Sequence, residues 1–318
     1  MIKEAVIYLW GFAKRSYTVM EIRTGFATGL PVLSGGLFGA CLSGELKIVE
    51  LVLFTIAGFC FNIIANTANE IRAYIANEEN EETFTGHAGS EGLVRGDAKF
   101  IDAVLVLLLM LGLGGGSGLL LVWLTKSVGL FVWGVLSVLA AFTYSLGPKP
   151  YLLFPVTELV SGFFVGGLSC YLSAYIQAGG NSWSILWYSL ISMIFTIFLM
   201  STNNIGDYKK DMGVRRTLPH VIGFRRAILL LIPEAGIMVA AWTALLFIGA
   251  IPWWQYLVGW LIFYRQGYVN WYKDYYHIQE VYPEMGREYG PRPLLLIYHF
   301  HGWMSLIFLI QLLGGGNI

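Results

Sequence analysis

The chain has 318 residues, of which 56% are hydrophobic and only 13% are charged, and its formal net charge is zero. With a mean hydropathy of +0.64, it is more apolar than the core of a soluble domain requires, so we expect an integral membrane protein. The balanced charge, with basic residues spread over several loops, argues against nucleic-acid binding. The three cysteines lie in apolar runs without a C-x-x-C pair, which argues against a disulfide framework or a zinc site.

Apolar runs of membrane-spanning length recur along the sequence. Taking about 20 residues as one crossing, we predict nine transmembrane helices and an all-α fold class. The expected spans are roughly 18–42, 48–71, 100–125, 128–147, 154–178, 184–205, 225–249, 252–270 and 294–313. Of the 20 Lys and Arg residues, only Lys47 and Lys126 fall on one side of these spans, and the other 18 fall on the opposite side. This bias places the N-terminus and the large loops in the cytoplasm and the C-terminus outside.

A polar segment, Asn62–Tyr74, ends the second expected span. Within its sequence NIIANTANEIRAY, Asn66, Glu70 and Tyr74 are spaced i, i+4, i+8, so they share one face of a helix. The same Asn-x-x-x-acid spacing recurs 137 residues later. Each copy stands where an apolar helix meets polar chain, and both copies face the same expected side of the membrane. This repetition argues against coincidence.

The long loop after the second span, residues 75–99, joins an acidic run to a glycine-rich stretch. A long polar loop in a helical bundle is more often functional than idle. The glutamates of this run, among them Glu78, either extend a metal site or form a solvated acidic face. Arg95 follows the glycines on the expected cytoplasmic side, which favours it as a phosphate ligand.

Several expected spans contain glycines at helical spacing. Gly35 with Gly39, Gly162 with Gly166, and the run GLGGGSG at 112–118 are typical of helices that pack closely in lipid. The glycine run does not resemble a nucleotide-binding loop, because no Lys-Ser/Thr follows it and no strand precedes it. We therefore expect these glycines to have a structural role.

The fourth and fifth expected spans are joined by YSLGPKPYLLFPVTEL, residues 144–159. Two prolines flank Lys149, so they fix a turn that projects its ammonium group. The alternative is a lysine that snorkels from a helix end. Glu158 falls inside an apolar segment, as does Glu234 in the seventh span, and an acid in such a place marks a functional site by default.

The most polar stretch is Ser201–Gly223, STNNIGDYKKDMGVRRTLPHVIG. On a continuous helix, Asn203, Asp207 and Asp211 stack on one face and offer one amide and two carboxylates to a shared ligand. This donor set suits Mg²⁺, which takes one or two carboxylates and fills its other sites with water and phosphate oxygens. The alternative is a solvated helix end with charge pairs at i, i+4. Four basic residues nearby could meet the phosphates: Lys209, Lys210, Arg215 and Arg216.

These segments, together with the VRG loop and TELVSGFFVGG, resemble the UbiA-type intramembrane prenyltransferases. Within that family the chain is most similar to the branch that prenylates 1,4-dihydroxy-2-naphthoate in menaquinone synthesis. The resemblance covers nearly the whole chain, 1–318, as one domain of two pseudo-repeated halves with motifs near 62–74 and 201–216. It implies a helical bundle around a central cavity, in which two Asp-rich motifs hold Mg²⁺ against an isoprenoid diphosphate and an aromatic acceptor attacks the allylic carbon.

Transferred residue by residue, the resemblance fits Asn203, Asp207 and Asp211 fully. The first motif departs from the family, since Glu70 stands for the usual Asp and Ala73 for the next one, which leaves one negative charge fewer for a metal. The expected metal ligands are Asn66, Glu70, Asn203, Asp207 and Asp211. The expected catalytic residues are Asp207, Asp211, Lys149 and Tyr144, and the expected diphosphate ligands are Arg72, Arg95, Lys210, Arg215, Asn66 and Asn203.

The resemblance implies three partners: a prenyl diphosphate, a small aromatic acceptor and membrane lipid. Other functions stay open at this point. A related terpene cyclase or altered-substrate enzyme would ionise a similar diphosphate without the aromatic acceptor. A transporter also has repeated halves with polar helix ends, although its acids would be expected at the membrane midplane. The incomplete first motif also leaves open an inactive homologue that only binds lipid.

Overall fold

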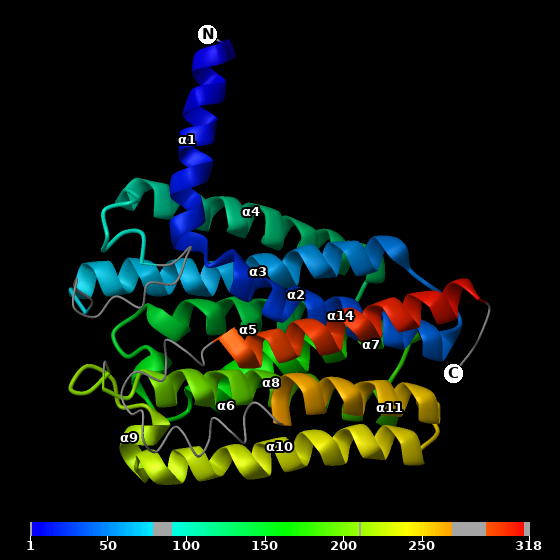
Figure 1. Ribbon diagram of the computed structural model, residues 1–318. Coiled ribbons are helices and arrows are strands. Elements are labelled where there is room, and N and C mark those ends of the chain that lie inside the picture. The colour runs from blue at the N-terminus through cyan, green and yellow to red at the C-terminus, as the bar shows by residue number, and fades with distance from the viewer. Residues whose placement is uncertain (1, 79–90, 210, 269–290, 315–318) are drawn as a thin grey trace.

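The computed structural model describes residues 2–78, 91–209, 211–268 and 291–314 (Figure 1). Their regular structure is helical throughout, which confirms the all-α fold class. The elements are α1 (Ile2–Met20), α2 (Ile22–Ser43), α3 (Ile48–Ala76), α4 (Phe100–Thr125), α5 (Val128–Ser145), η1 (Tyr151–Leu153), α6 (Thr157–Ser161), η2 (Gly162–Leu168), α7 (Ser169–Ala178), α8 (Trp183–Gly206), α9 (Leu218–Ile222), α10 (Phe224–Phe247), α11 (Trp253–Ile262), η3 (Phe263–Tyr268) and α14 (Pro291–Leu313).

Eight helical segments of the described chain are long and apolar enough to cross a membrane. One of them, Thr157–Ala178, is built from α6, η2 and α7 in succession. The remaining span, expected at 252–270, coincides with α11 and η3, which the structure describes as far as Tyr268. Because eight such segments are present in the described chain, the protein is an integral membrane protein. The count of nine and the central cavity stay predictions.

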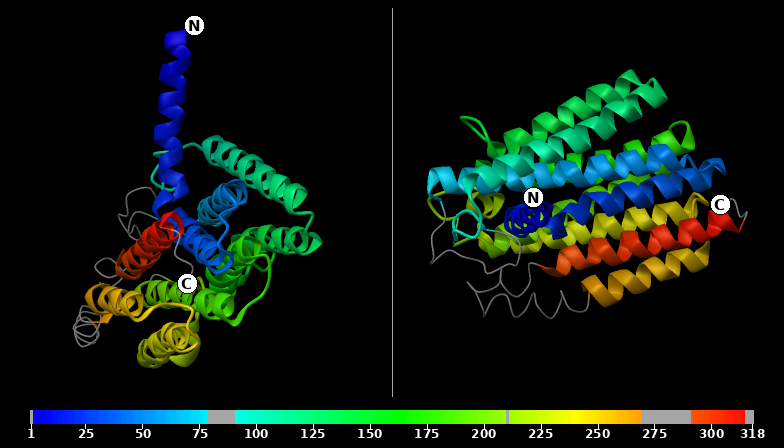
Figure 2. Two further views of the ribbon diagram at one scale, coloured as in Figure 1. Left: turned by 90° about the vertical axis from the view of Figure 1, so that its right-hand side faces the viewer. Right: turned by 90° about the horizontal axis from the view of Figure 1, so that it is seen from above.

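The first expected span, 18–42, combines parts of two helices. Glu21 has a φ of 43° and a ψ of 50°, in the left-handed region, and it separates α1 from α2. Because a helix cannot continue through such a residue, the chain changes direction there. Figure 1 and the two views in Figure 2 show α1 at a right angle to the bundle.

The interior of the bundle is formed mainly by α2, α7, α8 and α14. In α2, 78% of an apolar stretch of 18 residues is buried, whereas in α4 and α5 only 17% of the corresponding stretch is buried. The small residues explain the close packing: a Cβ on Gly39 would lie 2.2 Å from the backbone oxygen of Ala174, and one on Gly166 2.3 Å from that of Ser192. The expectation of close helix packing is thus confirmed for these two glycines.

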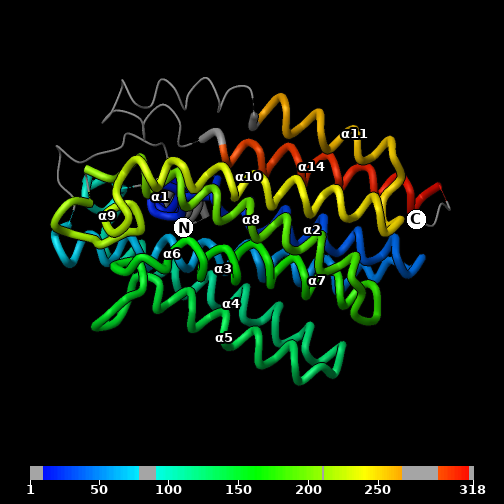
Figure 3. The backbone as a smooth tube through the Cα atoms, turned by 90° about the horizontal axis from the view of Figure 1, so that it is seen from below, coloured from blue at the N-terminus to red at the C-terminus, as the bar shows by residue number. Residues whose placement is uncertain are grey.

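The glycine run in α4 behaves differently. A Cβ on Gly114 would lie 2.7 Å from the Cβ of Cys60 in α3, whereas one on Gly112, Gly115, Gly116 or Gly118 would have nothing within 4 Å among the described residues. For most of the run, the expected packing role is wrong. The reason is that α4 lies at the edge of the bundle, so most of its circumference has no helical neighbour (Figure 3).

The two polar motifs lie at the same end of the bundle. The C-terminal end of α3, the start of α4, the turn after α5 and the segment from α8 to α9 all gather there (Figures 1 and 3). The C-terminal end of α14 lies at the opposite end. This arrangement brings segments more than a hundred residues apart into one polar region.

Candidate active site

The second motif begins inside helix α8 and continues beyond the end of that helix. Helix α8 ends at Gly206, and Asp207 caps it with φ −85° and ψ 6°. Asn203, Asp207 and Asp211 therefore do not stack on one continuous helix, and that prediction was wrong. Their one-turn spacing persists because the Asp207 N–H donates to the Asn203 carbonyl (2.9 Å) and the Asp211 N–H to the Asp207 carbonyl (2.8 Å).

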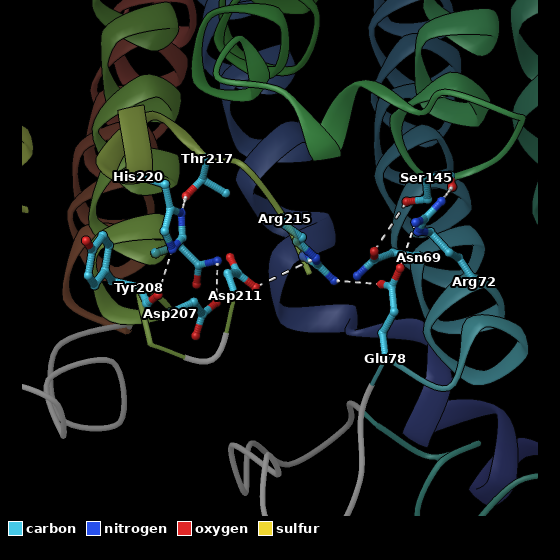
Figure 4. A network of polar contacts seen from close by, with 11 residues as sticks. Asn69, Arg72, Glu78, Ser145, Asp207, Tyr208, Asp211, Arg215, Thr217 and His220 are labelled. Atoms are coloured by element: carbon cyan, nitrogen blue, oxygen red, sulfur yellow. Dashed lines mark hydrogen bonds and ion pairs between the residues drawn. The ribbon is translucent and has the colours of Figure 1, made fainter. Parts of the chain in front are cut away.

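A histidine holds the turn that follows α8. The His220 ring stacks on Tyr208, with centroids 4.5 Å apart. Its Nε2 lies 2.8 Å from the Tyr208 carbonyl and its Nδ1 2.8 Å from the Thr217 hydroxyl (Figure 4). Because a carbonyl only accepts, Nε2 carries the proton and donates, and Nδ1 accepts from Thr217. His220 thus fixes the segment that carries Asp211 and Arg215.

The acids of the second motif lie in different environments. The Asn203 amide, on an exposed residue, donates to an Asp207 carboxylate oxygen at 3.3 Å. Asp207 is partly buried, and Asp211 is only 4% exposed. A buried carboxylate requires a compensating charge or hydrogen bonds. For Asp211 one such charge is Arg215, whose Nε lies 3.7 Å away.

At the end of α3, Arg72 and Glu78 form a second polar group. One Arg72 nitrogen donates to a Glu78 carboxylate oxygen at 2.6 Å, and another donates to the Ser145 carbonyl of α5 at 3.3 Å. The Ser145 hydroxyl in turn donates to the Asn69 amide oxygen at 3.4 Å. These contacts connect the first motif to α5.

Arg215 joins the two motifs. Its guanidinium lies between Asp211 and Glu78, 3.7 Å from a carboxylate oxygen of each (Figure 4). Burial alone lowers the pKa of Arg215, but Asp211, Tyr144, Glu78 and Asp207 outweigh burial and raise it. The guanidinium therefore stays charged, and we call the set Arg72, Glu78, Asp211 and Arg215 the Arg215 network.

The buried nitrogens of this network are only partly satisfied. The Nε atoms of Arg72 and Arg215 are buried and have no hydrogen-bond partner among the described residues. The contacts of Arg215 at 3.7 Å are electrostatic, since they are too long for hydrogen bonds. Buried donors are nearly always satisfied in native proteins. One carboxylate oxygen of Glu78 is likewise buried without such a partner, so the network holds two unpaired donors and one unpaired acceptor in the described chain.

Tyr144 belongs to the same region. It interacts electrostatically with Arg215, Asp211 and Asp207, and its ring packs edge-on against Tyr151 at 5.3 Å. Burial raises the pKa of Tyr151, which lies in η1. The phenol of Tyr151 therefore stays neutral.

Glu70 has a different environment from the one its spacing predicts. Its two carboxylate oxygens accept hydrogen bonds from the backbone N–H groups of Glu91 (3.1 Å) and Leu93 (2.8 Å), and the residue is 6% exposed. These bonds hold the 91–98 turn against α3. No three acidic, histidine or cysteine side chains of the described chain form a metal-holding group. In the described chain Glu70 thus forms no such three-acid group with Asp207 and Asp211, and its role as a metal ligand stays a prediction.

The remaining expected ligands are spread over this end of the bundle. The Asn66 amide nitrogen donates to Thr24 and, at 3.0 Å, to Asn62, while no hydrogen bond to its amide oxygen is found among the described residues. Lys149 is exposed in the turn after α5. Arg95 forms an ion pair with Asp97 at 3.5 Å. Lys210 lies outside the described residues.

The two intramembrane acids singled out from the sequence both contact the last turns of α8. The Asn204 amide donates to Glu158 at 2.7 Å, and the Ser201 hydroxyl donates to Glu234 at 2.8 Å. All four residues are at most 7% exposed. The second oxygen of each carboxylate is buried without a hydrogen-bond partner in the described chain. These acids therefore hold the end of α8 where the second motif begins.

Sequence reasoning missed the partners of these acids. Asn204 and Ser201 stand beside Asn203 in the sequence, but they point to other helices. One usable signal was the pairing of a buried acid with an amide in another apolar segment. For His220 no spacing signal exists, because its contacts depend on the turn itself.

Fold and site together define a polytopic helical membrane protein with acidic and cationic side chains clustered at one end. A model of the UbiA prenyltransferase family matches residues 28–285. The chain therefore belongs to the UbiA prenyltransferase family and is a prenyltransferase, as the motifs indicated.

Curated relatives agree with the expected branch of the family. The chain is 24% identical over 271 residues to a 1,4-dihydroxy-2-naphthoate octaprenyltransferase of Haemophilus influenzae, covering 79% of this chain and 84% of the relative. It is 27% identical over 126 residues to a protein of the same description from Bacillus subtilis, covering 39% and 40% of the two chains.

Solved structures share the fold. A UbiA homolog from Archaeoglobus fulgidus bound to GPP and Mg²⁺ superimposes with a TM-score of 0.63 at 16% identity, covering 96% of this chain and all of that chain. A digeranylgeranylglyceryl phosphate synthase gives a TM-score of 0.62 at 14% identity, covering 94% and 99% of the two chains. At these identities the likeness shows the fold alone.

Proposed function

We propose that this chain transfers a prenyl group from its diphosphate to a small aromatic acceptor of the dihydroxynaphthoate class, in a reaction that depends on Mg²⁺. The observation that carries the proposal is the Arg215 network. It joins the two motifs and leaves the buried Nε atoms of Arg72 and Arg215 without hydrogen-bond partners in the described chain. Diphosphate oxygens would satisfy both donors.

The oxygen donors at this end of the bundle fit Mg²⁺. The carboxylates of Asp207 and Asp211, with the amide oxygens of Asn203 and Asn66, form the kind of hard-oxygen set that this ion takes. Glu70 would join them only by giving up its hydrogen bonds to the 91–98 turn. When bound, the ion would neutralise the charge that develops on the leaving diphosphate.

The residues of the chain supply the rest of the reaction. The allylic C–O bond breaks and the diphosphate leaves, with Arg72 and Arg215 receiving its charge. A ring carbon of the acceptor then forms the new C–C bond and the ring loses its proton. Tyr144, beside Arg215, would line the diphosphate site, and Lys149, Arg95 and Lys210 are proposed as further cations there. The apolar helices would exclude water from the allylic cation.

Orientation follows from the charge bias of the loops. By the expected spans, 18 of the 20 Lys and Arg residues of the sequence fall on the motif side, which supports a cytoplasmic N-terminus and active site and an external C-terminus. A cytoplasmic site would receive a soluble acceptor from one side while the isoprenoid tail enters from the lipid.

The proposal is tested by mass spectrometry of products. The purified protein is incubated with Mg²⁺, prenyl diphosphates of several chain lengths and a panel of quinone precursors, with the Asp207→Asn variant as control. We expect a prenylated aromatic product that the control lacks. A terpene formed without acceptor would identify a cyclase. Substrate flux into vesicles without pyrophosphate release would identify a transporter, and neither product nor flux would indicate an inactive homologue.

A further inference from the structure

Among the long helices of the described chain, α1 departs from the common direction of the bundle. Figure 1 shows it at a right angle to the neighbouring helices, and the end-on view in Figure 2 shows it extending outward past α4. It has 19 residues, yet it is not among the eight segments apolar enough to cross a membrane. If the bundle stands upright in a bilayer, α1 lies in the plane of that bilayer.

The C-terminal end of α1 is firmly attached to the bundle. Arg15 makes a two-pronged ion pair with Asp102 in the first turn of α4, at 2.8 and 3.1 Å. The Thr18 carbonyl accepts from the Gly92 N–H at 3.2 Å. A Cβ on Gly92 would lie 2.2 Å from the Thr18 hydroxyl, so only glycine allows this contact. The direction of α1 is thus set by specific contacts.

These contacts also fix the depth of α1. Helix α3 has 29 residues, or about 44 Å at 1.5 Å per residue, whereas a hydrocarbon core of about 30 Å takes about 20 residues. Counted from Lys47 at its start, the inner edge of the core falls near Thr67. The Thr67 hydroxyl donates to the Val19 carbonyl of α1 at 3.4 Å. Helix α1 therefore leaves the bundle at the boundary between acyl chains and headgroups.

The face of α1 without a protein neighbour has the composition of such a boundary. Trp10 is 74% exposed and Tyr17 is 41% exposed, and Lys14 between them is exposed too. These positions are spaced i, i+4, i+7 and share one face. The opposite face is covered, since Ser16 is 5% and Val19 1% exposed. Trp and Tyr concentrate at membrane–water interfaces, and Lys reaches outward to headgroups.

We propose that α1 is an interfacial helix whose partner is the lipid surface, with Trp10 and Tyr17 embedded at the headgroup boundary. The polar residues of α1 explain why it does not span the membrane, and its contacts with α4 and the 91–98 turn explain why it stays attached to the bundle. The helix is also connected to the first motif, because the 91–98 turn that contacts Thr18 is the turn held by Glu70. The bilayer surface thereby helps to position the end of α3.

The test measures the depth of residue 10 in the full-length protein. A Trp10→Cys variant is labelled with an environment-sensitive fluorophore, and the three native cysteines are buried and do not compete for the label. The protein is reconstituted in phosphatidylcholine–phosphatidylglycerol vesicles containing nitroxide lipids that quench either just below the headgroups or near the midplane. Matched controls carry the label at Asp97, in an exposed turn, and at Leu109, which is 49% exposed halfway along α4.

We expect a blue-shifted emission at position 10 and stronger quenching by the shallow nitroxide than by the deep one. Position 97 should show little quenching, and position 109 should be quenched most by the deep nitroxide. If the label at position 10 were quenched as little as the label at position 97, α1 would lie in water. If it were quenched in the same pattern as the label at position 109, α1 would cross the membrane. Protection from both nitroxides, with self-quenching that rises with protein density, would mean that a second copy covers this face. Each of these three outcomes overturns the proposal.

Discussion

The two motif segments share a spacing but differ in what surrounds them. The first stays helical to Ala76, and its acid, Glu70, is bonded to the backbone of a neighbouring turn. The second leaves the helix at Gly206, and its two aspartates lie in an irregular turn beside Arg215. The same Asn-x-x-x-acid pattern thus places one acid against a backbone turn and the other beside an arginine, where we propose ligand binding. Spacing alone does not assign a carboxylate its role.

The largest expected effect is the loss of activity when either aspartate of the second motif segment is removed. Asp207→Ala and Asp211→Ala should each lower turnover by at least about 10²–10³-fold, because each removes a carboxylate that we propose as a metal ligand and as a stabiliser of developing charge. Product formation is measured across a Mg²⁺ titration, and elution from size exclusion in detergent checks the fold. If both variants kept their Mg²⁺-dependent activity, neither aspartate would belong to the metal site.

The next prediction tests the link between the segments. Arg215→Gln should raise the KM for the prenyl diphosphate by roughly 10- to 100-fold, because a hydrogen bond to a charged group contributes about 1.5–3 kcal/mol. Arg216→Gln is the matched control, since Arg216 is a neighbour whose backbone N–H, donating to Leu153, is unaffected by the change. Equal effects of both substitutions would show that only the general positive charge of the turn matters.

A smaller effect is expected at Glu70, and it shows whether this acid holds the 91–98 turn or binds the metal ion. Glu70→Ala leaves two buried N–H groups without acceptors, so the free energy of unfolding should fall by about 1–3 kcal/mol for each. Thermal unfolding in detergent measures this loss. Glu70→Gln keeps one acceptor and should lose less stability, while the Mg²⁺ concentration for half-maximal activity stays near that of the parent protein. A large rise in that concentration for Glu70→Gln would instead make Glu70 a metal ligand.

The sequence predicted the spans and the shared end of the motifs well, because apolar length and loop charge are local properties that the membrane enforces. It did not predict where helices stop. The break at Glu21 and the end of α8 at Gly206 each lie within two residues of a contact with a distant segment, Val19 with Thr67 and Asn204 with Glu158, which no local pattern contains. The bonds of Glu70 were not predicted for the same reason, since its partners lie more than 20 residues away, at Glu91 and Leu93.

The smallest expected effect concerns the acids that hold the last turns of α8. Glu158→Gln keeps an acceptor for the Asn204 amide, so activity should stay within about threefold of the parent, since a net hydrogen bond contributes only about 1 kcal/mol. Glu158→Ala removes the acceptor and leaves the Asn204 amide buried and unpaired, so the motif end of α8 should shift and the KM for Mg²⁺ should rise. The same pair of substitutions at Glu234 tests its bond to Ser201. Steady-state kcat and KM values for all four variants show whether Glu158 and Glu234 only hold α8 in place or take part in the reaction. If the Gln variants were as inactive as the Ala variants, the acids would be needed for their charge or proton, and the second motif would extend into the membrane.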